Sequence, residues 1–136
     1  MISHAEACRL IETPLDRLDE LLAAASAVRD RGRGRRVTFS MKVFVPLTTL
    51  CRDYCRYCAF RRDPGEPGAR TMTPEEVVAL VQAGGRVGAK EALFSLGDKP
   101  ELKYPSYRRW LHAQGYATTL AYLRAMCQRV FEETGL

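Results

Sequence analysis

Three cysteines follow directly after a short apolar segment, and this arrangement limits what the chain can fold into more than any other feature. Residues 43–45 are β-branched and aromatic, which predicts a buried strand that ends at Pro46. Cys51, Cys55 and Cys58 come next, within eight residues. Thiolates this close together select soft metals, either zinc or an iron–sulfur cluster. A closed zinc site needs four ligands, whereas three cysteines on a four-iron cluster leave one iron open for another ligand.

A zinc site would need its fourth ligand from elsewhere in the chain. The candidates are Cys8, Cys127, His4 and His112. Both of these cysteines lie in segments with helical signals and away from metal-like spacing, so each is also interpreted as a small buried apolar residue. At this level of reasoning the zinc module and the iron–sulfur site are both open.

Length and composition set outer bounds on the protein. A chain of 136 residues forms at most one domain, and a hydrophobic fraction of 46% is ordinary for a globular protein. No apolar run approaches the length of a membrane span, and the N-terminus lacks the core of a signal peptide. Five cysteines, three of them clustered, fit a reducing compartment, so we expect a cytoplasmic protein without a membrane partner.

The net charge of +5 is concentrated in one short segment. Residues 29–36 hold five arginines and one aspartate, and the rest of the chain carries 16 basic and 15 acidic residues. An arginine–glycine segment is compatible with nucleic-acid binding, but no aromatic residue interleaves these arginines as a stacking surface would need. We interpret the segment as a solvated linker and expect no nucleic-acid partner.

Helix and strand signals alternate along the chain. Thr13 and Pro14 predict the start of a helix with one apolar stripe, which we interpret as core or packing surface. That stripe consists of Leu15, Leu18, Leu21, Leu22, Ala25 and Val28. Thr73 and Glu76 form a capping box for a second helix, and Thr119 is the expected cap of a third. Strands are expected over residues 36–40, 43–45 and 91–96, the last two buried.

This order predicts an α/β fold with a parallel sheet, because strands that alternate with helices are joined by right-handed crossovers. In such folds the loops at the carboxyl ends of the strands carry the chemistry. The cysteine loop and residues 97–101 both follow a predicted strand. We therefore expect these two loops to lie side by side.

The Cys-x3-Cys-x2-Cys spacing, with Tyr57 just before the third cysteine, resembles the radical S-adenosylmethionine (SAM) superfamily. The resemblance implies that the three cysteines hold a 4Fe-4S cluster whose open iron is chelated by SAM. Reductive cleavage of SAM then yields a 5′-deoxyadenosyl radical, with electrons from a flavodoxin- or ferredoxin-type reductant. It also implies that Tyr57 packs near the adenine and that Gly97 and Asp98 receive the SAM amino group.

A closer resemblance is to the 7,8-didemethyl-8-hydroxy-5-deazariboflavin synthases, specifically their ring-closing subunit or half. The matching segments are residues 38–47, Lys90 to Glu101, Trp110–Leu111, Gly115–Tyr116 and Tyr122 to Met126. The resemblance implies a small-molecule substrate, the adduct of tyrosine with 5-amino-6-ribitylaminouracil. Hydrogen abstraction, ring closure and ammonia loss then give the deazaflavin of coenzyme F(420). The sister radical SAM subunit, which makes the adduct, is an implied partner or fused half. The sister subunit is also the alternative identification of this chain, because both have the same kind of cysteine loop.

One departure from the family pattern concerns length. A β/α barrel of eight units takes about 250 residues, whereas strand signals here end after two βα units. We therefore expect the N-terminal part of a partial barrel, with helices and a basic linker over residues 1–36 and the start of the radical SAM core over residues 37–136. We expect this length alone to be inactive, and turnover by the isolated chain would contradict that expectation.

Overall fold

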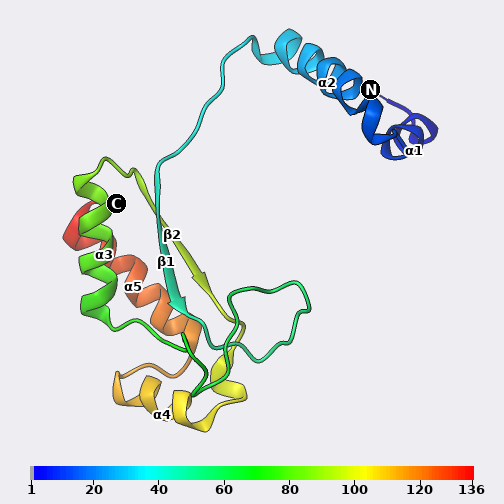
Figure 1. Ribbon diagram of the computed structural model, residues 1–136. Helices are drawn as coiled ribbons and strands as arrows, with labels where there is room; N and C mark the ends of the chain where they lie inside the picture. Colours follow the sequence, from blue (N-terminus) through cyan, green and yellow to red (C-terminus); the bar gives the residue numbers. More distant parts are fainter. Residues whose placement is uncertain (1) are drawn as a thin grey trace. The chain divides into compact units, whose positions relative to one another are not determined.

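The computed structural model describes residues 2–136, and it divides into a unit that ends at Phe39 and a second unit that runs from Ser40 to Leu136. The first unit contains α1 (His4–Ile11), the 3₁₀ helix η1 (Leu15–Arg17) and α2 (Leu18–Arg33). The second contains β1 (Lys42–Thr48), α3 (Pro74–Arg86), β2 (Glu91–Leu96), η2 (Pro100–Leu102), α4 (Pro105–Ala113) and α5 (Thr119–Thr134) (Figure 1).

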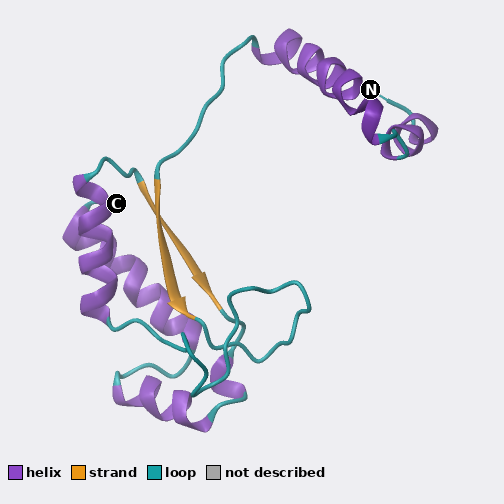
Figure 2. Cartoon of the chain, viewed as in Figure 1, coloured by secondary structure: helices purple, strands orange, loops and turns teal. Residues whose placement is uncertain are grey.

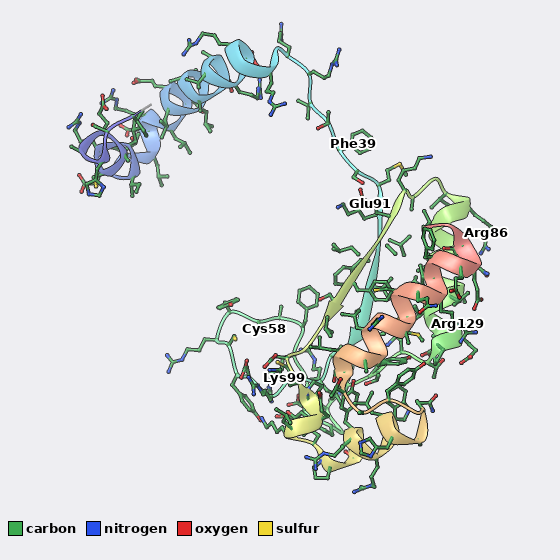
Figure 3. All side chains as sticks on the ribbon, turned by 180° about the vertical axis from the view of Figure 1, so that it is seen from behind. Phe39, Cys58, Arg86, Glu91, Lys99 and Arg129 are labelled. Atoms are coloured by element: carbon green, nitrogen blue, oxygen red, sulfur yellow. The ribbon has the colours of Figure 1, made fainter. Side chains whose placement is uncertain are left out.

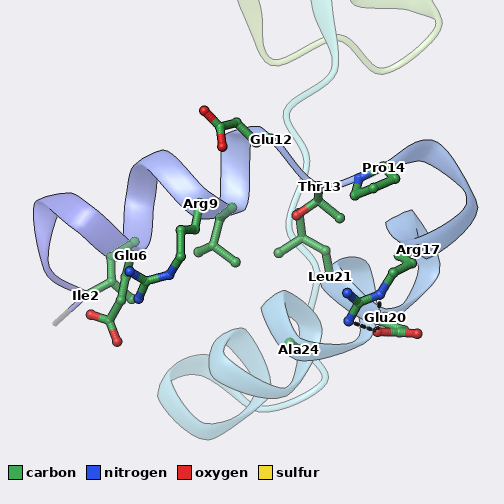
Figure 4. A pocket seen from close by; sticks show the side chains of 11 residues that line it. Ile2, Glu6, Arg9, Glu12, Thr13, Pro14, Arg17, Glu20, Leu21 and Ala24 are labelled. Carbon is green, nitrogen blue, oxygen red and sulfur yellow. Dashed lines mark hydrogen bonds and ion pairs between the residues drawn. The ribbon is translucent and has the colours of Figure 1, made fainter.

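In the first unit, the predicted helix start at Thr13 is wrong. Pro14 precedes the 3₁₀ turn, and α2 begins only at Leu18 without a side-chain cap. The expected apolar stripe is also not a core, since Leu15 is 87% exposed and α2 buries no residue among those described. Figure 4 shows an open groove between α1 and α2, with an Arg17–Glu20 ion pair of 2.8 Å at its rim.

The second unit is built on two parallel strands, which are hydrogen-bonded from Lys42 opposite Glu91 to Thr48 opposite Leu96. The predicted strand 91–96 is confirmed. The prediction that the first strand ends at Pro46 is wrong, because β1 continues to Thr48 with a register shift just after the proline. A proline is tolerated there because β1 is an edge strand of this two-stranded sheet. Residues 36–40, predicted as a strand, have no regular structure.

The core lies between one face of the sheet and the helices α3 and α5 (Figure 2). Val45 and Leu47 of β1 are fully buried there, packed in one cluster with residues of both helices. The opposite face carries Phe44 and Leu93, which are 43% and 48% exposed. The expectation that both strands are buried is therefore only half right: the helices cover a single face.

Helix capping orients the elements around the carboxyl ends of the strands. Thr73 and Glu76 form the predicted capping box of α3. The cap of α5 is Thr118 and not Thr119 as expected, because the Thr118 hydroxyl accepts the amide of Ala121. Thr119 instead donates its amide (3.2 Å) and hydroxyl (2.5 Å) to the buried carboxylate of Glu101. This contact ties the loop after β2 to the start of α5.

Within residues 2–136, no helix combines the length and the apolar character that crossing a bilayer requires.

Candidate functional site

The cysteine loop leaves the sheet at the carboxyl end of β1 and is closed at its base by backbone pairing. Leu50 pairs with Arg62 in a parallel bridge, and the Arg62 amide donates to the Thr49 carbonyl at 2.9 Å. The loop after β2 lies beside it, since the Arg52 amide donates to the Asp98 carbonyl at 3.0 Å. The two loops thus lie side by side as the parallel topology predicts.

Cys51 is the most firmly held of the three thiols. It is half-buried, and its sulfur accepts the backbone amides of Asp98 (3.2 Å) and Asp53 (3.4 Å). Its carbonyl oxygen accepts the Tyr104 hydroxyl at 3.1 Å. These contacts fix the position of the Cys51 sulfur at the base of the loop.

Cys55 and Cys58 are exposed on the outer part of the loop, where Figure 3 labels Cys58. A single turn joins them, with the Cys58 amide donating to the Cys55 carbonyl at 3.0 Å. The backbone amides of Arg61 and Phe60 lower the pKa of the Cys58 thiol, and the positive charges of Arg61 and Arg62 add to the effect. A lowered pKa increases the thiolate fraction, which is the form that binds metal.

Gly97 allows the two loops to approach closely. A Cβ atom built at this position would lie 1.9 Å from the carbonyl oxygen of Leu50 and 2.6 Å from the Cβ of Cys51. No side chain fits there. Glycine is therefore required because the backbone of the cysteine loop lies so close, and not because of an unusual φ angle.

Asp98 contacts the cysteine loop through its backbone and its side chain. Besides the two backbone contacts already described, its carboxylate pairs with the Arg52 guanidinium at 2.5 Å. Lys99, which follows, is the one non-glycine residue with a positive φ (37°) in the described part of the chain. This left-handed residue turns the chain directly from β2 into η2.

Tyr57, expected near an adenine, is 91% exposed at the outer part of the loop. Phe60 is 63% exposed, and its ring lies 5.9 Å from that of Phe44 on the open face of the sheet. Phe60 also lines a pocket of about 150 Å³ together with Cys51, Cys58, Gly97 and Asp98. The pocket therefore brings together four of the six predicted site residues, and Cys55 and Tyr57 lie outside its lining.

No set of three His, Cys, Asp or Glu side chains within residues 2–136 is arranged to hold a metal ion. The candidates for a fourth zinc ligand lie on three helices. His4 and Cys8 contact each other on α1 (3.6 Å), while His112 and Cys127 are on α4 and α5. Cys8 and Cys127 are exposed, so their interpretation as buried apolar residues is wrong.

The site also contains a polar cluster that sequence reasoning missed. Asp63 accepts the hydroxyl of Tyr104, pairs with Arg61 and accepts the hydroxyl of Tyr54 at 3.1 Å. The guanidinium of Arg61 and the ammonium of Lys103 each lie 3.5 Å from the centroid of the Tyr54 ring. No sequence signal connects Asp63 with Tyr104, which lies 41 positions further on.

The Asp63→Asn variant is expected to change the pH dependence of stability. The Tyr104 hydroxyl and the Arg61 guanidinium lower the pKa of Asp63 to about 2. An Asp whose pKa is lowered by folding stabilises the fold above its unfolded value of about 4, and this contribution is lost as the pH falls toward 2. The wild type should therefore exceed Asp63→Asn in unfolding free energy at pH 6, and the gap should close between pH 4 and 2.

Urea unfolding of both chains at a series of pH values measures this gap. Asp53→Asn is the matched control, because Asp53 is on the same loop but its ion pair with Arg52 is long and exposed (3.7 Å). A wild-type advantage over Asp63→Asn that stays constant from pH 6 to pH 2 would contradict the assignment.

Comparison with known proteins places this site in a family. The family model of the Radical SAM superfamily matches residues 45–126. This range includes all three cysteines of the loop and also Gly97 and Asp98, which follow β2. The chain belongs to the radical SAM superfamily. Membership implies a 4Fe-4S cluster and SAM as cofactors, and it confirms the predicted superfamily.

The similar curated proteins carry one activity in their names. An FO synthase of Streptomyces avermitilis is 46% identical over 96% of this chain, and one of Mycobacterium leprae is 46% identical over 88%. A 7,8-didemethyl-8-hydroxy-5-deazariboflavin synthase of Methanosarcina barkeri is 48% identical over 68% of the chain. The chain spans 16%, 15% and 28% of the length of these three relatives. No solved structure matches the chain.

Proposed function

We propose that this chain is the cluster- and SAM-binding part of a 7,8-didemethyl-8-hydroxy-5-deazariboflavin synthase. The observation that carries the proposal is the shared pocket in which Cys51 and Cys58 meet Gly97 and Asp98. The names of the similar proteins support the choice of this reaction within the superfamily.

Cys51, Cys55 and Cys58 would be the protein ligands of the 4Fe-4S cluster. The donor set fits an iron–sulfur cluster, because it is made of soft thiolates on one short loop. The lowered pKa of Cys58 favours its thiolate form, and two backbone amides fix the position of the Cys51 sulfur. When bound, the cluster supplies the electron that cleaves SAM.

Gly97 and Asp98 would bind the amino group of SAM at the end of β2. Asp98 is paired with Arg52, so its carboxylate must exchange this partner or share it when an ammonium group arrives. Tyr57 would pack against the adenine, which requires the exposed outer part of the loop to bend over the pocket. Gly97 and Asp98 already line the pocket, and Tyr57 would reach it only through this movement.

The substrate would be the adduct of tyrosine and 5-amino-6-ribitylaminouracil, and the products the deazaflavin ring and ammonia. β1–α3 and β2 with the helices that follow it would be the first two units of a β/α barrel, after an N-terminal segment over residues 1–36. The relatives are several times longer than this chain and have the length that a full barrel needs. A cytoplasmic location, the sister subunit or fused half, and a flavodoxin- or ferredoxin-type reductant are part of the same proposal.

Anaerobic reconstitution tests the proposal directly. The chain is incubated with iron and sulfide and desalted, its metal content is measured, and the EPR spectrum of the reduced protein is recorded with and without SAM. We expect close to four irons per chain and a spectrum that changes when SAM is added. Stoichiometric zinc, no iron and no response to SAM would identify a zinc module instead.

A further inference from the structure

We propose that the hydrogen bond between Asp63 and Tyr104 is a positioning device for the cysteine loop. It would hold Cys51, at the start of the loop, and Asp63, after its end, in place before any metal is present. The inference rests on the proposed function, since it assigns a role toward the cluster to residues that are not ligands. We call the Asp63–Tyr104 pair the brace.

The Tyr104 end of the brace is rigid. Tyr104 is 9% exposed, its amide donates to the Pro100 carbonyl at 2.9 Å, and its own carbonyl accepts the Arg108 amide at 3.1 Å in the first turn of α4. From this fixed position the single hydroxyl reaches both the Cys51 carbonyl at 3.1 Å and the Asp63 carboxylate. One side chain outside the loop therefore contacts the loop at its first cysteine and again just after its last one.

At the other end of the brace, Asp63 contacts residues of the cysteine loop. Its carboxylate binds Tyr54, which lies between the first two cysteines, and Arg61, which lies three residues after the third. Arg61 also lines the pocket beside Cys58, and its backbone amide is directed at the Cys58 sulfur. Displacement of Asp63 would therefore move Arg61, which lines the pocket beside Cys58.

The outer part of the loop makes few contacts. Residues 52–60 are all exposed, and the backbone hydrogen bond from Cys58 to Cys55 makes only a local turn. The pairing of Leu50 with Arg62 closes the loop one residue before Cys51 and one residue before Asp63. The brace adds a side-chain connection beside this pairing, because the Tyr104 hydroxyl contacts both Asp63 and the Cys51 carbonyl. The position of the loop's base therefore depends on these contacts as well as on its backbone pairing.

The test compares two buried tyrosines. Tyr104→Phe removes the hydroxyl of the brace and changes no charge. Tyr122→Phe is the matched control, because the buried Tyr122 hydroxyl donates to the Met72 carbonyl at 2.7 Å in the core between α5 and the sheet. Tyr104→Phe loses contacts to the Asp63 carboxylate and the Cys51 carbonyl, whereas Tyr122→Phe loses one bond to a neutral carbonyl, so Tyr104→Phe should lower thermal stability at least as much as the control.

Two readouts separate positioning from stability. In the metal-free chain, the alkylation rate of Cys51 is measured against the exposed Cys8 and Cys127 as internal references. In the reconstituted chain, the rate of cluster loss to a chelator is followed by absorbance. For Tyr104→Phe we expect both rates to rise about fivefold, the effect of losing about one hydrogen bond. Tyr122→Phe should leave both rates unchanged.

Equal rates in Tyr104→Phe and Tyr122→Phe would overturn the inference and leave the proposed function intact. If the unmodified chain takes up no iron, the proposed function fails, and the inference fails with it. The two failures are distinguishable because the unmodified chain is measured in the same experiment.

Discussion

Replacing any one of Cys51, Cys55 and Cys58 with alanine is expected to abolish cluster binding and, with it, the EPR response to SAM. With three protein ligands and one iron reserved for SAM, loss of a thiolate leaves two cysteines to hold four irons. Cys55 and Cys58 are exposed, so their removal opens no cavity and the fold should survive. Iron content and EPR of the reconstituted variants measure the loss, and circular dichroism checks that the variants are folded.

Cys8→Ala and Cys127→Ala are the matched controls for this prediction. Both side chains are exposed thiols on helices, and neither lies on the cysteine loop. We expect both controls to keep the full iron content. Wild-type iron in Cys55→Ala or Cys58→Ala, or its loss in Cys127→Ala, would show that the metal is held by a different set of ligands.

Gly97→Ala is expected to destabilise the second unit by about 3 kcal/mol, at the upper end of what overpacking usually costs. The added Cβ would meet the Leu50 carbonyl at 1.9 Å and Cys51 at 2.6 Å, and none of these atoms belongs to a flexible side-chain end. Either the end of β2 or the first cysteine must move away. We therefore expect weaker cluster retention together with a lower urea midpoint.

Gly85→Ala is the control for this substitution. Its Cβ would make an ordinary contact of 3.5 Å with Leu136, and Gly85 lies in α3, where alanine is favoured over glycine by about 1 kcal/mol. We expect neutral or slightly increased stability and unchanged iron content. A Gly97→Ala chain as stable as the wild type would show that the two loops are not in the close contact described above.

Local sequence signals predicted the elements that depend on local chemistry. The strand 91–96 and the capping box of Thr73 with Glu76 needed only neighbouring residues, and both are present as predicted. Thr13 failed as a cap because a 3₁₀ turn intervenes before α2. Pro46 failed as a strand end because an edge strand does not need every backbone donor.

The site was predictable only in part, for a related reason. The cysteine spacing identified one loop, and the alternation of strands and helices indicated that residues 97–101 lie beside it. Neighbouring residues in the sequence did not indicate which side chains are buried or which distant segments are in contact. Cys127 occurs in an amphipathic helix, yet it lies on the exposed side, and the contact between Asp63 and Tyr104 exists only after folding brings the two segments together.

The unequal environments of the three thiols also determine how the metal-free site would be damaged by air. Cys58 is exposed and has a lowered pKa, so it is the thiolate that oxidants reach first. Cys55, exposed and three positions away, is the nearest thiol in sequence to capture the resulting sulfenic acid as a disulfide. Cys51 is shielded by the amides at its sulfur and by its half-buried position. Air would therefore remove two ligands as a pair while leaving the third reduced, and a thiol reductant would restore both.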